Sequence, residues 1–80
     1  MNPTPRQAEV LCWIARFTDE SSISPTYREI AVAFEMSHSA ARKLVDGLRD
    51  RGLLEYGYGK HRATDITDAG QAFVDGQGCK

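Results

Sequence analysis

The sequence predicts a mainly helical domain in which a small β-hairpin follows three helices and precedes a short C-terminal helix. Apolar residues recur at helical spacing in three successive segments, and each segment begins with a side chain that can cap a helix. After Gly52 the pattern changes to two short strand-like runs around a glycine-rich turn. A chain of 80 residues has room for one hydrophobic core, so we expect one domain over residues 1–75 and a flexible tail over 76–80.

The first helix is predicted to begin at Pro5. Thr4 can act as its N-cap, and Gln7 stands three residues later, which completes a capping box. One apolar stripe at helical period then consists of Val10, Leu11, Ile14 and Phe17. Residues 18–22 form a polar cluster, which predicts a loop after this helix.

Two further helices are predicted between residues 26 and 51. Thr26 and Glu29 form a second capping box before a helix of about two and a half turns. Its apolar face consists of Ile30, Ala31 and Phe34. Ser37 is the predicted N-cap of the next helix, from His38 to Arg51, and Gly52 stands where a left-handed C-cap belongs. The core positions of that helix are Ala41, Leu44, Val45 and Leu48.

The remaining elements are two strands over residues 53–56 and 62–66, joined by a hairpin tip over 57–61. Thr67 is the predicted N-cap of a last helix that runs through Val74. A short helix, a tight turn, a second helix and a hairpin directly after it match the winged helix-turn-helix arrangement.

The bulk composition excludes several classes of protein. The hydrophobic share is 41% and the charged share 26%, values of an ordinary soluble domain. The longest apolar run, residues 10–15, is too short to span a membrane and has no signal-peptide flanks, so we expect a cytoplasmic protein without a membrane partner. Catalytic motifs such as G-x-S-x-G, a phosphate-binding glycine loop and H-E-x-x-H are missing from the sequence. We therefore expect neither an enzyme nor a cofactor.

The two cysteines, Cys12 and Cys79, stand nearly a whole chain apart and lack the clustered spacing of metal ligands. We expect no metal site. A disulfide between them is one alternative, and two reduced thiols, the usual state in the cytoplasm, are the expected one.

One face of the third helix suggests contact with nucleic acid. Opposite the core stripe lie Ser39, Arg42, Lys43, Asp46 and Asp50. Such charges are typical of any solvated helix, but here they follow a cap and a tight turn and precede a basic hairpin. Arginine can pair bidentately with guanine in the major groove, and we expect Asp46 to orient Arg42 by an i,i+4 pair. The candidate DNA-binding residues are Ser37, His38, Ser39, Arg42, Lys43, Tyr27, Arg28, Tyr58, Lys60, His61 and Arg62.

The net charge of −1 hides a pattern along the chain. Residues 1–35 carry three basic and five acidic groups, residues 36–62 six basic and three acidic, and residues 63–80 one basic and three acidic. The predicted third helix and hairpin thus carry +3 between flanks of −2 each.

Three runs of sequence resemble the N-terminal DNA-binding domain of the LexA repressor: RQAEVLCWIA at 6–15, PTYREIA at 25–31 and LRDRGLLE at 48–55. The resemblance covers residues 4–66, and its last run is shared with MarR-like winged helices. It implies a third helix docked in the major groove, with Ser39, Ala40, Arg42 and Lys43 facing bases and the 57–62 hairpin touching the backbone.

The chain also departs from that family pattern. Arg42 and Lys43 replace acidic residues of the LexA recognition helix, so we expect a different operator. Glu35 stands where many helix-turn-helix units have glycine. The 80 residues contain no counterpart of the LexA protease half, so a self-cleaving repressor is not expected.

The function predicted from the sequence is specific binding of double-stranded DNA by a small bacterial or phage regulator, expected to be a repressor. The alternative is a winged-helix module that binds a protein such as a polymerase, a recombinase or a host regulator, as excisionase-like factors do. RNA binding is not separable from these by sequence. A homodimer built on Phe73 and Val74 is one alternative, and packing of the same residues against the first helix is the other.

Overall fold

The computed structural model describes residues 3–56 and 64–77, which form four helices and two strands. In chain order these are α1 (Pro5–Ser21), α2 (Tyr27–Ala33), α3 (His38–Asp50), β1 (Leu54–Glu55), β2 (Asp65–Ile66) and α4 (Asp68–Gln77). This order confirms the predicted fold class, a mainly helical domain with a two-stranded antiparallel hairpin in a winged-helix arrangement.

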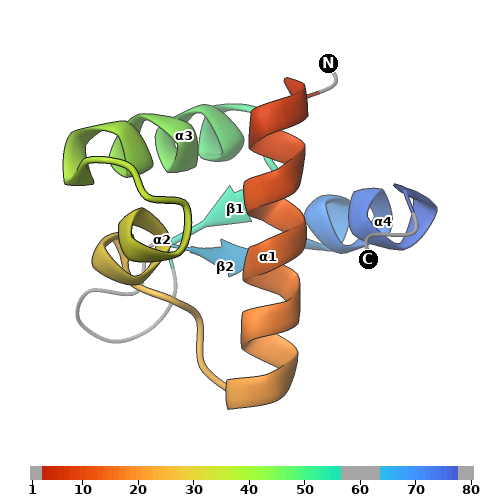
Figure 1. Ribbon diagram of the computed structural model, residues 1–80. Helices are drawn as coiled ribbons and strands as arrows, with labels where there is room; N and C mark the ends of the chain where they lie inside the picture. The colour runs from red at the N-terminus through yellow and green to blue at the C-terminus, as the bar shows by residue number, and fades with distance from the viewer. Residues whose placement is uncertain (1–2, 57–63, 78–80) are drawn as a thin grey trace.

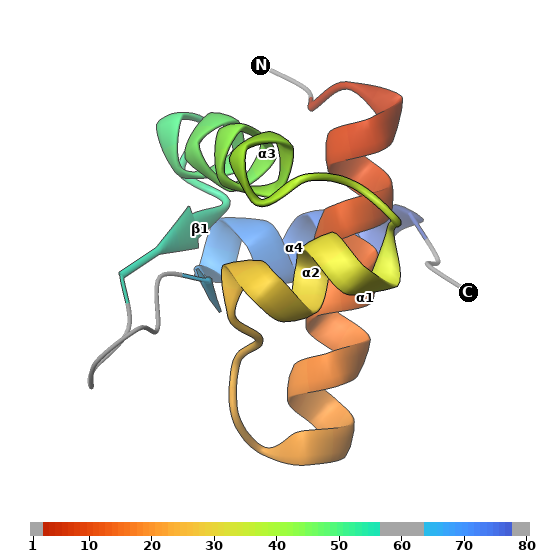
Figure 2. The ribbon, with the colours of Figure 1, turned by 60° about the vertical axis from the view of Figure 1, so that its left-hand side comes forward.

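The long helix α1 runs through the middle of the domain, with other elements on both sides of it (Figure 1). Helix α3 lies across its N-terminal half, α2 lies beside α3, and α4 lies on the other side of α1. The C-terminal end of α1 and the loop that follows it project away from the other elements in both ribbon views (Figure 2). Helices α2 and α3 pack against each other on one side of α1.

The predicted N-caps of the first three helices are confirmed. Thr4 Oγ1 accepts a hydrogen bond from Gln7 N at 3.2 Å, and Gln7 Oε1 accepts one from Thr4 N at 2.9 Å. The same reciprocal pair joins Thr26 and Glu29, and Ser37 Oγ accepts from Ala40 N at 3.1 Å. Each bond satisfies a backbone N–H that has no partner within its helix. The starts of α1, α2 and α3 are therefore local properties of the sequence.

The predicted loop over residues 18–22 is wrong, because α1 continues to Ser21. Thr18 Oγ1 donates to the carbonyl of Ile14 at 2.8 Å, so the hydroxyl bonds within the helix instead of breaking it. The helix ends at Ser22, which is left-handed with φ 62° and donates its N–H to the carbonyl of Thr18. The polar residues of this segment belong to an exposed last turn.

The core forms where α1, α2, α3 and β1 meet. Its buried hydrophobic residues are Val10, Leu11, Ile14, Ala15, Ile30, Ala31, Ala41, Val45, Leu48, Leu53 and Leu54. Three predicted core residues, Phe17, Phe34 and Leu44, are only half-buried. Trp13 packs at the core edge, with ring centroids 5.2 Å from Phe17 and 5.8 Å from Phe34. These three aromatic rings therefore form one cluster at the edge of the core.

The strands are shorter than predicted. They pair antiparallel with Leu54 opposite Ile66 and Glu55 opposite Asp65. The predicted hairpin tip over 57–61 and the first two residues of the second predicted strand lie outside the described residues.

Helix α4 begins after Thr67, whose Oγ1 accepts from Gly70 N at 3.0 Å, and it continues to Gln77. Phe73 and Val74 pack against the core, as one of the two sequence alternatives proposed. No helix within residues 3–56 and 64–77 is long and apolar enough to cross a membrane.

Cys12 is half-buried on α1 and is disulfide-bonded. The expectation of a reduced thiol at this position is therefore wrong. Separation along the chain says little about distance in the fold, which is why spacing alone could not decide between the two alternatives. Cys79 lies outside the described residues.

Candidate nucleic-acid interface

The first two turns of α3 expose a polar and basic surface. Ala41, Val45 and Leu48 are each 0% exposed, so the opposite side of the helix faces outward. The five candidate residues on and just before α3 are all exposed: Ser37, His38, Ser39, Arg42 and Lys43. Ala40, which the family resemblance placed toward bases, is half-buried.

Asp46 does not orient Arg42, contrary to the sequence prediction. The Asp46 carboxylate instead pairs with Arg49, three residues further along α3. Arg49 is held beside Asp46 because its guanidinium also contacts Tyr27 and Tyr56. Arg42 and Lys43 take part in no ion pair within residues 3–56 and 64–77. Both cations are consequently available to an external anion.

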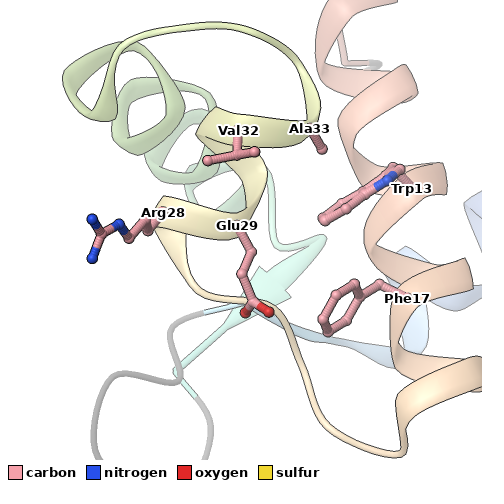
Figure 3. A pocket seen from close by; sticks show the side chains of 6 residues that line it. All are labelled: Trp13, Phe17, Arg28, Glu29, Val32 and Ala33. Atoms are coloured by element: carbon pink, nitrogen blue, oxygen red, sulfur yellow. The ribbon is translucent and has the colours of Figure 1, made fainter.

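Helix α2 brings its first residue to the start of α3. The half-buried Tyr27 ring meets the His38 ring edge-on, with centroids 5.7 Å apart. Arg28, the next residue, is exposed, and its side chain points away from α1 (Figure 3). The Tyr27–His38 contact thus joins candidates of both helices into one surface, which we call the α2–α3 face: Tyr27, Ser37, His38, Ser39, Arg42 and Lys43. Arg28 instead lines a hollow between α1 and α2.

The four hairpin candidates, Tyr58, Lys60, His61 and Arg62, lie outside the described residues. The last described residue before them is Tyr56, which is 72% exposed and has the Arg49 guanidinium over its ring.

Arg49 is a residue that sequence reasoning missed. Burial lowers its pKa, but the hydrogen bond to Tyr27 and the electrostatic effects of the Tyr27 and Tyr56 phenol groups and the Asp46 carboxylate more than offset this, so the pKa is raised. Arginine is a cation at any physiological pH, and the Asp46 carboxylate balances the charge of Arg49. The signal available in the sequence was the i,i+3 spacing of Asp46 and Arg49 on one helix.

A second surface feature lies away from the exposed residues of α3. Between α1 and α2 there is an open, mainly apolar hollow of about 360 Å³ (Figure 3). Its lining residues are Trp13, Phe17, Arg28, Glu29, Val32 and Ala33. Val32, one of these lining residues, is 73% exposed to solvent.

The described residues contain no group of three or more His, Cys, Asp or Glu side chains that could hold a metal ion. What the α2–α3 face offers to a ligand is therefore positive charge, hydroxyl groups and the start of a helix.

Comparison with known proteins places this geometry in a family. Residues 1–63 match the model of the LexA DNA binding domain. The chain is also 33% identical over 64 residues to the LexA repressor of Koribacter versatilis (strain Ellin345), a match that covers 79% of this chain and 30% of the relative. The chain thus spans less than a third of the length of that relative. With the fold, the caps and the exposed face of α3 in agreement, the chain belongs to the LexA DNA-binding domain family.

Proposed function

We propose that this chain binds specific sequences of double-stranded DNA as a transcriptional regulator, most simply a repressor. The N-terminal half of α3 enters the major groove, and the hairpin after β1 contacts the backbone or the minor groove. The observation that carries the proposal is the pair of exposed cations Arg42 and Lys43 on the outer side of α3, without an ion-pair partner among the described residues.

The chemistry of these residues suits a base edge. An arginine can donate two parallel hydrogen bonds to guanine O6 and N7, and a serine hydroxyl such as Ser39 can donate or accept. The partial positive charge at the start of α3 favours a nearby phosphate. Tyr27 and Arg28 lie on the adjoining helix, where contact with the DNA backbone would set the position of α3.

The charge pattern predicts modest non-specific binding. The segment 36–62 carries +3, but the flanks carry −2 each and repel phosphate. A large difference between specific and random DNA is therefore expected to come from base contacts and not from bulk charge.

Selection of bound fragments from random-sequence DNA tests the proposal directly. We expect an enriched motif, and affinity for it that falls by about one log unit per log unit of salt for each phosphate neutralised. Equal binding of the selected and the random DNA at about 150 mM salt, roughly physiological, contradicts specific regulation. Enrichment of an RNA pool in place of DNA contradicts the choice of DNA.

Two substitutions separate base reading from backbone contact. Arg42→Ala is expected to lose about 1–3 kcal/mol of discrimination at one base pair, because a bidentate contact is removed. Lys60→Ala is expected to weaken binding to all sequences alike, because phosphate contacts carry no sequence information. Fluorescence anisotropy with single-base operator variants measures both. Arg16→Ala, which removes an exposed arginine from α1, is the matched control and should change neither.

Dimerisation on DNA remains part of the proposal. Two copies on half-sites one helical turn apart would add their contacts, and the selected motif would then be an inverted repeat. Sedimentation with and without the selected DNA measures the stoichiometry, and a non-symmetric motif bound by one copy contradicts the dimer.

The second candidate function is the binding of a protein partner in the cytoplasm. The apolar hollow between α1 and α2 is the described feature that favours it. The Val32→Ser change separates the two functions, since Val32 lies at the hollow and outside the α2–α3 face. We expect this variant to bind the selected DNA as the unchanged protein does. A loss of DNA affinity in a folded Val32→Ser variant would place the hollow within the DNA interface instead.

A further inference from the structure

Arg49 lies where α2, α3 and the end of β1 meet. Its Nη1 donates a hydrogen bond to Tyr27 Oη at 3.1 Å, and its Nη2 pairs with Asp46 Oδ1. Its guanidinium carbon lies 4.2 Å from the centre of the Tyr56 ring. The Arg49 side chain is only 15% exposed, so these contacts enclose most of it. One side chain therefore touches a residue of α2, a residue of α3 and the residue that follows β1.

These contacts depend on the shape of a guanidinium group. Its planar edge carries several N–H donors in fixed directions, while its flat face can stack on an aromatic ring. The Tyr27 hydroxyl and the Asp46 carboxylate accept hydrogen bonds from the guanidinium N–H groups, and the flat face of the guanidinium lies over the Tyr56 ring. A lysine ammonium keeps the charge but has no planar face and no fixed fork of donors.

Tyr27 extends the connection to the start of α3. Its ring meets His38 edge-on at 5.7 Å, next to the exposed residues of the helix. A continuous set of contacts, which we call the Arg49 network, thus runs from Tyr56 through Arg49 and Tyr27 to His38.

The role of Arg49 differs from that of Arg42 and Lys43. Asp46 balances its charge, and little of its surface is open to solvent. Arg42 and Lys43 are exposed and pair with no described carboxylate. Arg49 is therefore suited to holding protein groups together and poorly suited to holding phosphate.

We propose that Arg49 is a positioning residue for DNA binding. It holds Tyr56 at the base of the hairpin and Tyr27 at the start of α2 in one orientation relative to the exposed side of α3. Groups that are ordered before binding lose less conformational freedom when the DNA arrives, so the affinity is higher. The inference rests on the proposed function, because it concerns how the same surface is presented.

The test compares Arg49→Lys with the unchanged protein on the selected DNA. We expect affinity to fall about tenfold, the effect of losing a cation–π contact and a charged hydrogen bond. The salt dependence should stay the same, since lysine keeps the positive charge and Arg49 is paired with Asp46 and not with a phosphate. The base preference at the base pair that Arg42 contacts should stay the same. Arg16→Lys, an equivalent change on the exposed side of α1, is the matched control and should leave all three quantities unchanged.

A double-mutant cycle distinguishes positioning from a general loss of stability. Tyr56→Leu should weaken binding when Arg49 is present and add little in the Arg49→Lys background, because both changes break one contact. Arg49→Lys affinity within twofold of the unchanged protein overturns the inference, and so do fully additive effects of the two changes.

A measurement on the free protein, without DNA, tests the Arg49 network independently of the proposed DNA binding. In NMR spectra of the free protein, Arg49→Lys should shift the ring signals of Tyr56 and His38, while the core methyl signals stay in place. Unchanged ring signals overturn the Arg49 network, whatever the protein binds. Shifted ring signals in a protein that does not prefer the selected DNA would support the network and contradict the proposed function.

Discussion

Glu35 connects α2 to α3 in a left-handed conformation, with φ 52°. A side chain with a β carbon meets its own backbone in this region, at a cost of roughly 1 kcal/mol that glycine avoids. The sequence already marked the position, because many helix-turn-helix units have glycine there. The structure confirms that the turn requires the conformation and that Glu35 adopts it. Glu35 is exposed, so its side chain contributes little packing.

Glu35→Gly is expected to stabilise the domain by about 0.5–1 kcal/mol, because the strain at this turn is relieved. Urea denaturation gives the free energy of unfolding. The control is Glu35→Ala, which also removes the charge but keeps a β carbon, and which should give no gain. Equal changes for both variants would show that the charge and not the backbone matters.

Among the elements, the helix starts were predicted correctly, whereas the end of α1 and the lengths of the strands were not. A capping box is completed within four residues, so Thr4 with Gln7 and Thr26 with Glu29 were readable without the fold. The extension of α1 to Ser21 rests on a local bond from Thr18 to the Ile14 carbonyl, and β1 and β2 are only two residues long each. Polar residues on an exposed final helical turn have the composition of a loop, so their pattern predicted the wrong structure.

Gly70 shows how tightly α4 docks on the segment before β1. A β carbon at this position would lie 2.1 Å from the carbonyl oxygen of Leu53, which accepts a hydrogen bond from Thr67 N. Gly70→Ala is therefore expected to destabilise the domain by about 2 kcal/mol or more, since backbone atoms must shift.

Gly76 is the matched control on the same helix, because a β carbon there would meet nothing within 4 Å. Gly76→Ala is expected to raise stability by up to about 1 kcal/mol through helix propensity. Thermal unfolding of the two variants measures the contrast, and similar melting temperatures would contradict the close docking of α4.

At the scale of the whole molecule, one buried hydrogen bond joins two distant parts of the chain. Thr64, only 1% exposed, donates from its hydroxyl to the carbonyl of Pro25 at 2.6 Å across a sequence separation of 39 residues. The bond connects the residue before β2 with the loop that leads into α2. It therefore helps to hold the returning strand against the side of the domain that carries the α2–α3 face.

Thr64→Val keeps the size of this side chain and leaves the buried Pro25 carbonyl without its donor. The expected loss in the free energy of unfolding is about 1–3 kcal/mol. Thr64→Ser keeps the hydroxyl, so its free energy of unfolding is expected to fall by less, and mainly because a buried methyl group is removed. Denaturant titration of both variants measures the difference, and equal losses would contradict a role for the hydrogen bond.

The sequence by itself determined the kind of fold, the helix starts and the position of the basic surface. These follow from residues within one or two helical turns of each other, such as Ser37 capping α3 or Arg42 lying outside the buried stripe of Ala41 and Val45. Only the tertiary structure decided which arginine of α3 pairs with Asp46 and which is left to bind an external anion. Asp46 could have paired with Arg42 or Arg49 along α3, and local spacing allows both. Tyr27 from α2 and Tyr56 after β1 hold Arg49 beside Asp46, so contacts made by folding leave Arg42 exposed on the surface.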